Sequence, residues 1–141
     1  PYWNSKSRGL ITGLTRDSDW RDLVRATIES VAYQTSDLFL SMRKDGLNPK
    51  SVKVDGGMVS NNWFVQFLSE ILKIKITRSK INETTALGAA YMAGYQIGIY
   101  RSVSDIKQNW KKDRDFKPKF NKSYRNKLLQ GWQQAIKKTL A

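Results

Sequence analysis

The sequence has 141 residues, of which 40% are hydrophobic, a length and composition that suit one globular domain with a buried core. It contains no cysteine and no histidine, which excludes disulfides, thiolate metal sites and catalysis by an imidazole base. The formal net charge is +13, and the segment 101–141 alone carries 12 basic and 3 acidic residues.

The first part of the chain predicts a strand region followed by a long helix. Pro1-Tyr2-Trp3 begins without an initiator methionine, so we expect this start to lie inside a longer or processed protein. Arg8 to Thr15 is punctuated by glycines and predicts one short strand or a pair of strands. Asp17-Ser18-Asp19 offers N-cap residues for a helix over residues 19–45. Its apolar stripe, spaced by three and four residues, consists of Val24, Ile28, Val31, Thr35, Leu38 and Met42.

A strand, a tight turn and a helix N-terminus are predicted next. Ser51 to Val54 predicts the strand, Asp55-Gly56-Gly57 the turn, and the residues after Asn61 the helix. Glycines permit positive φ and close approach to the backbone, and the first N–H groups of a helix attract anions. Taken alone, the pattern fits either an ordinary turn or a turn that binds a phosphate or nucleoside. The predicted buried face of the helix, with its flanking aromatics, is Trp63, Phe64, Phe67, Leu68 and Ile71.

The later elements are a strand and three helices. Lys73 to Thr77 alternates with period two and predicts a strand with one wet face. A helix follows, capped by Thr84 or Thr85, and its small residues Ala86 to Ala90 predict close packing against a neighbouring helix or strand. A short helix is predicted over 103–110. The last elements are an extended linker at Asp115–Pro118 and a basic helix over 121–140 with the stripe Tyr124, Leu128, Trp132 and Ile136.

The alternation of strands and helices indicates an α/β layer. The basic C-terminal segment suits a solvated helix face, and a basic interaction module is the alternative reading. We expect no specific nucleic-acid binding, because no nucleic-acid-binding motif accompanies the charge. No apolar run approaches the roughly 20 residues of a membrane span, and no signal-peptide pattern opens the chain. These features predict no membrane insertion and a cytoplasmic location.

Several motifs together resemble the C-terminal signature of the FGGY carbohydrate kinases. They cover nearly the whole chain, through Gly131-Trp132. They are Pro1-Tyr2-Trp3 with Arg8–Leu14, Asp22–Thr35, Val54–Asn62 with Gln66-Phe67 and Ile71-Leu72, and Glu83–Ala90.

The resemblance implies a fold and a reaction. The fold is that of actin, the heat-shock ATPases and the sugar kinases (ribonuclease H-like), in which ATP binds between two α/β domains. Residues 1–141 would be the later part of the C-terminal domain, with the N-terminal domain and the start of the C-terminal domain absent. The members that the sequence resembles most transfer phosphate from ATP to glycerol, giving glycerol 3-phosphate and ADP. The alternative is a family member that phosphorylates another sugar, such as a pentulose.

The resemblance also implies site residues. Asp55-Gly56-Gly57 would be the adenosine-side turn, with the backbone of Gly57 against the nucleotide and Asn61 reaching the adenine. Ala86 to Ala90 would lie near the hinge between the two domains.

Phosphoryl transfer needs Mg²⁺, a phosphate cradle and a group that positions the attacking hydroxyl. In the family these groups, with the glycerol contacts, lie upstream of Pro1, so we predict no catalytic residue and no Mg²⁺ ligand in this chain. Asp55 is expected to accept backbone hydrogen bonds that hold the turn, and Glu83 to be a favourable charge at a helix start.

By itself the chain is predicted to be inactive. If the missing part supplies neighbouring strands, an unpaired sheet edge would favour association of copies.

Overall fold

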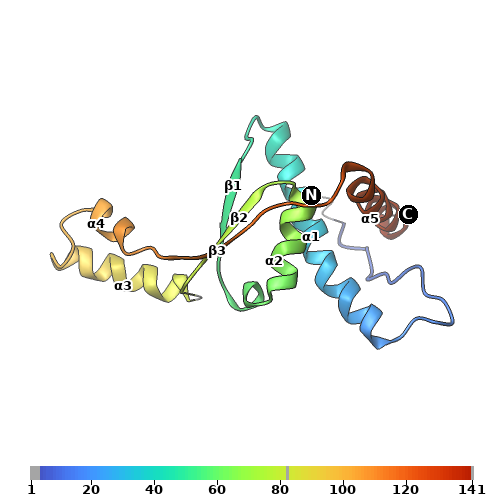
Figure 1. The fold of residues 1–141 in the computed structure, drawn as a ribbon, viewed down its shortest axis with the longest axis horizontal. Helices are drawn as coiled ribbons and strands as arrows, with labels where there is room; N and C mark the ends of the chain where they lie inside the picture. Colours follow the sequence, from blue (N-terminus) through green and yellow to red (C-terminus); the bar gives the residue numbers. More distant parts are fainter. Residues whose placement is uncertain (1–3, 82, 141) are drawn as a thin grey trace.

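The computed structural model describes residues 4–81 and 83–140; the predicted motif at Pro1-Tyr2-Trp3 lies outside the described residues. Figure 1 shows the elements in chain order. They are α1 (Trp20–Lys44), β1 (Ser51–Val54), the 3₁₀ helix η1 (Gly57–Ser60), α2 (Asn62–Leu72), β2 (Lys75–Ser79), α3 (Thr84–Gln96), α4 (Val103–Gln108), β3 (Lys112–Phe116) and α5 (Lys122–Leu140).

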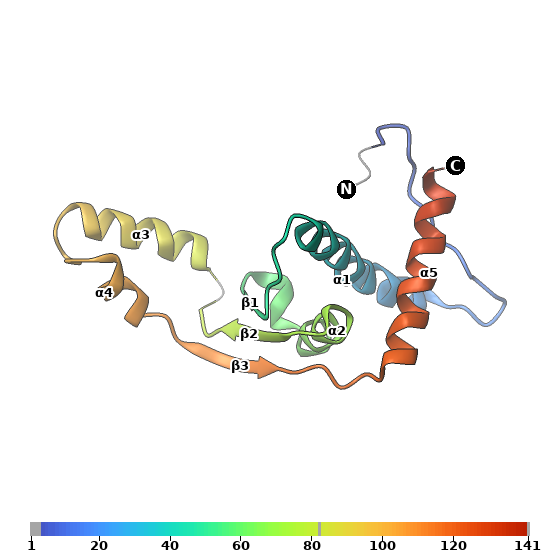
Figure 2. The same cartoon turned by 90° about the horizontal axis from the view of Figure 1, so that it is seen from above.

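The strands form one mixed sheet in the order β1-β2-β3. β1 and β2 are parallel, with Val52 opposite Ile76, and α2 makes the crossover between them. β2 and β3 are antiparallel, with Ile76 opposite Phe116. α1 and α5 pack against α2, so helices and sheet form the layers seen in Figure 2. The predicted α/β class is confirmed.

The core is centred on α2, which is apolar on most of its circumference. Its buried side chains include the predicted Phe64, Phe67, Leu68 and Ile71, whereas Trp63 stays 44% exposed. Strand and helix neighbours complete the core, and they are Ala32, Tyr33, Phe39, Val59, Ile74, Ile76 and Phe116. Since α2 is apolar on several faces, each face needs a neighbour that covers it, and these neighbours are α1, α5 and the sheet.

The predicted long helix is present, but its predicted stripe is only partly right. Asp19 caps α1 and forms a capping box with Asp22. Val24 and Leu38 are 48% and 56% exposed, because the first turns of α1 extend past α2 and the later contact face is rotated by one residue. The side chains that are buried are Ala32, Tyr33, Ser36, Asp37 and Phe39.

Three predictions that concern strands or extended segments are corrected. Residues 8–15 form no strand, because no described strand lies beside them to pair with their backbone. The extended linker predicted at Asp115–Pro118 overlaps β3, which pairs with β2 through its backbone despite its charged side chains. β2 begins at Lys75 rather than at Lys73, because Lys73 ends α2 in the left-handed conformation with φ 55°.

α3 and α4 form an arm that stands away from the sheet, as both views show. The small residues Ala86 to Ala90 are exposed or half-buried rather than closely packed, because no second surface lies against them in the described part of the chain. The cap prediction is also wrong, since the N-cap residue is Glu83 and its side chain caps nothing. Among the described residues of α3, Gly94 is closely packed, since an added Cβ would lie 2.9 Å from the Tyr100 ring, and the Tyr91 ring packs edge-on against Tyr100 at a centroid distance of 5.5 Å.

α5 is held by two buried carboxylates on the neighbouring helices. Asp37 accepts hydrogen bonds from Trp132 Nε1 at 2.7 Å and Gln133 Nε2 at 3.1 Å. Glu70 accepts from the backbone N–H groups of Lys119 and Phe120, just before α5. The predicted stripe of α5 is half-buried at Leu128, Trp132 and Ile136 and exposed at Tyr124. None of the helices in the described ranges is long and apolar enough to cross a membrane.

Candidate functional site

The predicted turn lies directly after β1 and leads into α2. Gly56 has φ +91° and ψ 172°, a conformation that strains any residue with a Cβ. A Cβ built at Gly56 or at Gly57 would meet no atom within 4 Å, so the space beside this backbone is open. Glycine is therefore required at position 56 by the backbone dihedral, and the openness permits an external group to approach the turn.

Asn61 is the N-cap of α2. Its Oδ1 accepts hydrogen bonds from the N–H groups of Trp63 at 3.0 Å and Phe64 at 3.2 Å. Because both partners are donors, the amide oxygen must face the helix. The amide nitrogen Nδ2 then lies on the other side, and it donates to none of the described residues. Two N–H groups that were expected to attract an anion are thus already paired, and Asn61 leaves a neutral amide donor available instead of free helix N–H groups for a phosphate.

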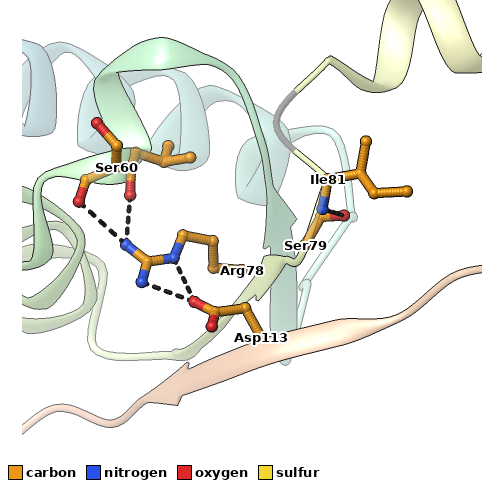
Figure 3. A network of polar contacts seen from close by, with 6 residues as sticks. Ser60, Arg78, Ser79, Ile81 and Asp113 are labelled. Atoms are coloured by element: carbon orange, nitrogen blue, oxygen red, sulfur yellow. Dashed lines mark hydrogen bonds and ion pairs between the residues drawn. The ribbon is translucent and has the colours of Figure 1, made fainter.

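A largely enclosed arginine that no sequence pattern predicted as a site residue holds the turn. Figure 3 shows Arg78 of β2, whose Nη1 donates to the carbonyl oxygens of Val59 at 2.7 Å and Ser60 at 3.3 Å. Its Nε donates to Asp113 Oδ2 on β3 at 2.7 Å, and its Nη2 lies 2.6 Å from the same oxygen. Only 12% of the Arg78 side chain is exposed. The guanidinium therefore connects the turn, β2 and β3.

The two carbonyls are free because of Asn61. In a continuous α-helix the N–H groups of Trp63 and Phe64 would bond to the carbonyls four residues earlier, at Val59 and Ser60. Here those N–H groups bond to the Asn61 side chain, and Arg78 occupies the carbonyls instead. Asn61 and Arg78 thus satisfy the two sides of one helix junction.

The predicted roles of the two nearby carboxylates differ in outcome. Asp55 is exposed and accepts no hydrogen bond from any residue that the structure describes, so the prediction that it holds the turn is wrong. The turn is held by Arg78, by the Val59 N–H to Gly56 carbonyl bond at 3.3 Å and by Ser60 Oγ, which donates to the Gly57 carbonyl at 2.7 Å. Glu83 precedes α3 and is exposed, as expected for a charge at a helix start.

No group of three or more acidic residues within 4–81 and 83–140 is arranged to hold a metal ion. The structure brings together an open glycine turn, an oriented amide donor and the Arg78–Asp113 pair. Gly56, Gly57 and Asn61, which the sequence predicted together, lie together. Arg78 and Asp113 were missed because they are separated by 35 residues and carry no local pattern.

Comparison with known proteins places this site in context. A family model described as "FGGY family of carbohydrate kinases, C-terminal domain" matches residues 1–97. Glycerol kinase 1 of Pseudomonas aeruginosa is 48% identical over 138 residues, and the glycerol kinase of Gluconobacter oxydans is 47% identical over 141 residues. These matches include at least 98% of the present chain, but the chain spans only 28% of the length of either relative.

Solved structures agree with the sequence matches. Plasmodium falciparum glycerol kinase with ADP superposes with a TM-score of 0.86 at 35% identity, over 100% of this chain and 28% of that one. A ligand-bound xylulose kinase from Lactobacillus acidophilus gives a TM-score of 0.71 at 23% identity, over 99% of this chain and 27% of that one. The second likeness speaks for the fold alone.

Proposed function

Because the chain belongs to the FGGY family of carbohydrate kinases and has the fold of their C-terminal domain, we propose that it contributes the adenosine side of the ATP site of a glycerol kinase. Residues 1–141 are the later part of that domain in this proposal. The observation that carries it is the turn Gly56–Asn61, which combines an open backbone surface with an amide donor directed away from its own helix.

The proposed reaction transfers the terminal phosphate of ATP to glycerol, giving glycerol 3-phosphate and ADP. Its support is the identity of 46–49% to several proteins named glycerol kinase. Likeness to xylulose and gluconate kinases, at 19–23% identity, concerns the fold and does not favour those sugars.

The described residues suit a nucleoside better than a triphosphate. The backbone at Gly57 offers an open surface, and Asn61 Nδ2 offers a donor for a ring nitrogen or another acceptor. The α2 N–H groups of Trp63 and Phe64 are occupied by Asn61 Oδ1 and so are not offered to phosphate. In this proposal the chain binds and orients the nucleoside, and it excludes water from that side of the cleft.

The reacting groups belong to other parts of the protein in this proposal. Mg²⁺ would neutralise phosphate charge as the γ-phosphoryl group moves, and its ligands, the phosphate cradle, the base and the glycerol contacts are assigned outside these residues. A cytoplasmic location stays a prediction, as does association of copies of the chain.

The test begins with the reaction. A chain of the relatives' length that contains this segment is assayed for ATP-dependent phosphorylation of glycerol beside a panel of pentuloses. Preference for glycerol supports the proposal, and preference for a pentulose overturns the substrate assignment.

The test continues with ATP binding. ATP is titrated calorimetrically into the same chain and its Asn61→Ala variant, at low salt and at about 0.3 M salt, where surface charges are screened. Binding that survives salt and weakens in the variant supports the adenosine site. Binding that disappears in salt and ignores Asn61 means that ATP contacts only a basic surface.

A further inference from the structure

We propose that Arg78 is a positioning residue for nucleotide binding, with Asp113 as the group that orients it. The inference rests on the proposed function, because it assigns a role within the same adenosine-side turn. Arg78 fixes the carbonyl groups of Val59 and Ser60, which directly precede Asn61. It thereby fixes where the Asn61 amide stands relative to the glycine turn.

The hydrogen bonds of Arg78 separate this role from direct phosphate binding. Nη1 is shared between two backbone carbonyls, and Nε and Nη2 both contact one oxygen of Asp113. The guanidinium also lies 5.4 Å from the centre of the Phe116 ring. A side chain that is 12% exposed and committed on three sides has little donor capacity left for a ligand. Its influence on a nucleotide must pass through the backbone that it holds.

The chemistry of this contact requires arginine. A planar guanidinium presents donors in two directions at once, toward the turn and toward Asp113. A lysine ammonium carries the same charge at a single point, so it can pair with Asp113 or reach the carbonyls but cannot span both. Arg78→Lys therefore keeps the charge and removes the connection between the sheet and the turn.

The contact of Arg78 with η1 involves only backbone atoms of η1 among the hydrogen bonds of the described residues. Because these atoms are main-chain oxygens, the side chains of the turn are free to differ without breaking the contact. Losing it leaves two carbonyls unpaired at the point where η1 meets α2, while the capping bonds of Asn61 remain. The expected consequence is an Asn61 amide that stays bonded to α2 but shifts, together with the start of α2, relative to the glycine turn, in a domain that remains folded.

The experiment uses a chain of the relatives' length that contains this segment, with the substitutions Arg78→Lys and Asp113→Asn and the double variant. Arg114→Lys is the matched control, because Arg114 is an exposed residue opposite Arg78 and makes no side-chain hydrogen bond or ion pair with any described residue. The measurements are the calorimetric Kd for ATP, the KM values for ATP and glycerol, kcat, and hydrogen exchange of residues 57–61.

We expect Arg78→Lys to raise the Kd and KM for ATP about tenfold, as loss of one charge-assisted contact would, with kcat and the KM for glycerol little changed. Asp113→Asn is expected to have a smaller effect in the same direction, and the double variant less than the product of the two. Exchange at 57–61 should accelerate in Arg78→Lys and not in Arg114→Lys.

Three results distinguish the proposals. An unchanged Kd for ATP in Arg78→Lys overturns the positioning role, even if the parent phosphorylates glycerol. A parent that binds ATP but does not phosphorylate glycerol overturns the substrate assignment, and the Kd series still decides the role of Arg78. Equal loss of kcat and of affinity for both substrates, with a lower melting temperature, means that Arg78 only stabilises the fold and overturns the inference.

Discussion

At the scale of single residues, the side-chain amide of Asn61 has two ends with separate partners. The oxygen is held by two backbone N–H groups of α2, and the nitrogen faces away from them. Any substitution that removes the whole side chain therefore changes helix capping and ligand contact together. The two contributions are separable by a substitution that keeps the oxygen.

Asn61→Asp retains an oxygen for the N–H groups of Trp63 and Phe64, and a carboxylate is favourable at a helix N-terminus. It removes the amide donor. We expect an unchanged melting temperature and an ATP affinity about tenfold weaker. The measurements are thermal unfolding and calorimetric titration of the chain that was used to test ATP binding.

Asn62→Asp is the matched control for added charge, because Asn62 is exposed and makes no side-chain hydrogen bond with a residue the structure describes. If both substitutions weaken ATP binding equally, charge and not the lost donor is responsible, and the assigned role of Asn61 is wrong.

At the scale of elements, the connection between α5 and α1 depends on a buried carboxylate. Asp37 is 6% exposed and accepts from Trp132, whose ring also stacks on Tyr33 at a centroid distance of 5.5 Å. Trp132→Phe keeps most of the ring contact and removes the N–H donor. We expect a loss of about 2 kcal/mol in the free energy of unfolding, since a buried acceptor loses a partner. Urea denaturation measures it.

Trp20→Phe is the comparison for Trp132→Phe, because Trp20 is 67% exposed at the start of α1. It should leave the denaturation midpoint unchanged. An equal loss in both variants would show that the Asp37 contact contributes nothing specific.

The contribution of the β2–β3 pairing to the stability of the fold should decrease at acidic pH. Hydrogen bonds from Thr77 Oγ1 at 2.7 Å and Lys112 Nζ at 3.1 Å hold the pKa of Asp115 below its usual value. Because the folded pKa is the lower one, this stabilisation is complete above the unfolded pKa of about 3.9 and is lost as pH falls through the folded pKa. Wild type and Asp115→Asn should differ in melting temperature near neutral pH and converge in acid. An Asp17→Asn variant, altered at an exposed residue, should track wild type throughout.

The sequence predicted those elements whose signal is local. α2 and β1 were found because apolar spacing and a glycine turn mark them, and α1 because Asp19 caps a long periodic stretch. β3 was missed because its residues Lys112 to Asp115 are all charged and show no apolar alternation, and their partners on β2 are distant in sequence.

The same limit applies to the site. Gly56, Gly57 and Asn61 are neighbours in sequence and were predicted together. Arg78 and Asp113 meet because β2 pairs with β3, which no spacing in the sequence reports. The predicted packing of Ala86 to Ala90 failed for a related reason, since composition indicates that a helix can pack closely but not what lies beside it.

At the scale of the whole molecule, burial is unevenly distributed. Eight of the α2 residues are buried, whereas α3 buries only Gly94. Backbone hydrogen bonds in an exposed helix open more readily than those in a core helix. We expect amide exchange in α3 to be at least tenfold faster than in α2, a ratio that corresponds to about 1.4 kcal/mol. Mass spectrometry of peptic fragments measures both helices in one sample, and equal protection of the two would contradict this view of the arm.

The arm leaves and re-enters the sheet at adjacent points. Ser79 and Lys112 are register partners, and the Lys80 N–H donates to the Lys111 carbonyl at 2.9 Å. The segment between these strand ends, which contains α3 and α4, takes the place of a hairpin loop, and the two ends are close enough to be joined by a short turn of the Asn-Gly type. Backbone pairing continues to Lys80 and Lys111, so the hydrogen bonds that set the register of β2 and β3 lie outside the arm. The two ends of the arm therefore leave the sheet one residue beyond Arg78 and one residue before Asp113, so the arm is joined to the protein directly beside that ion pair.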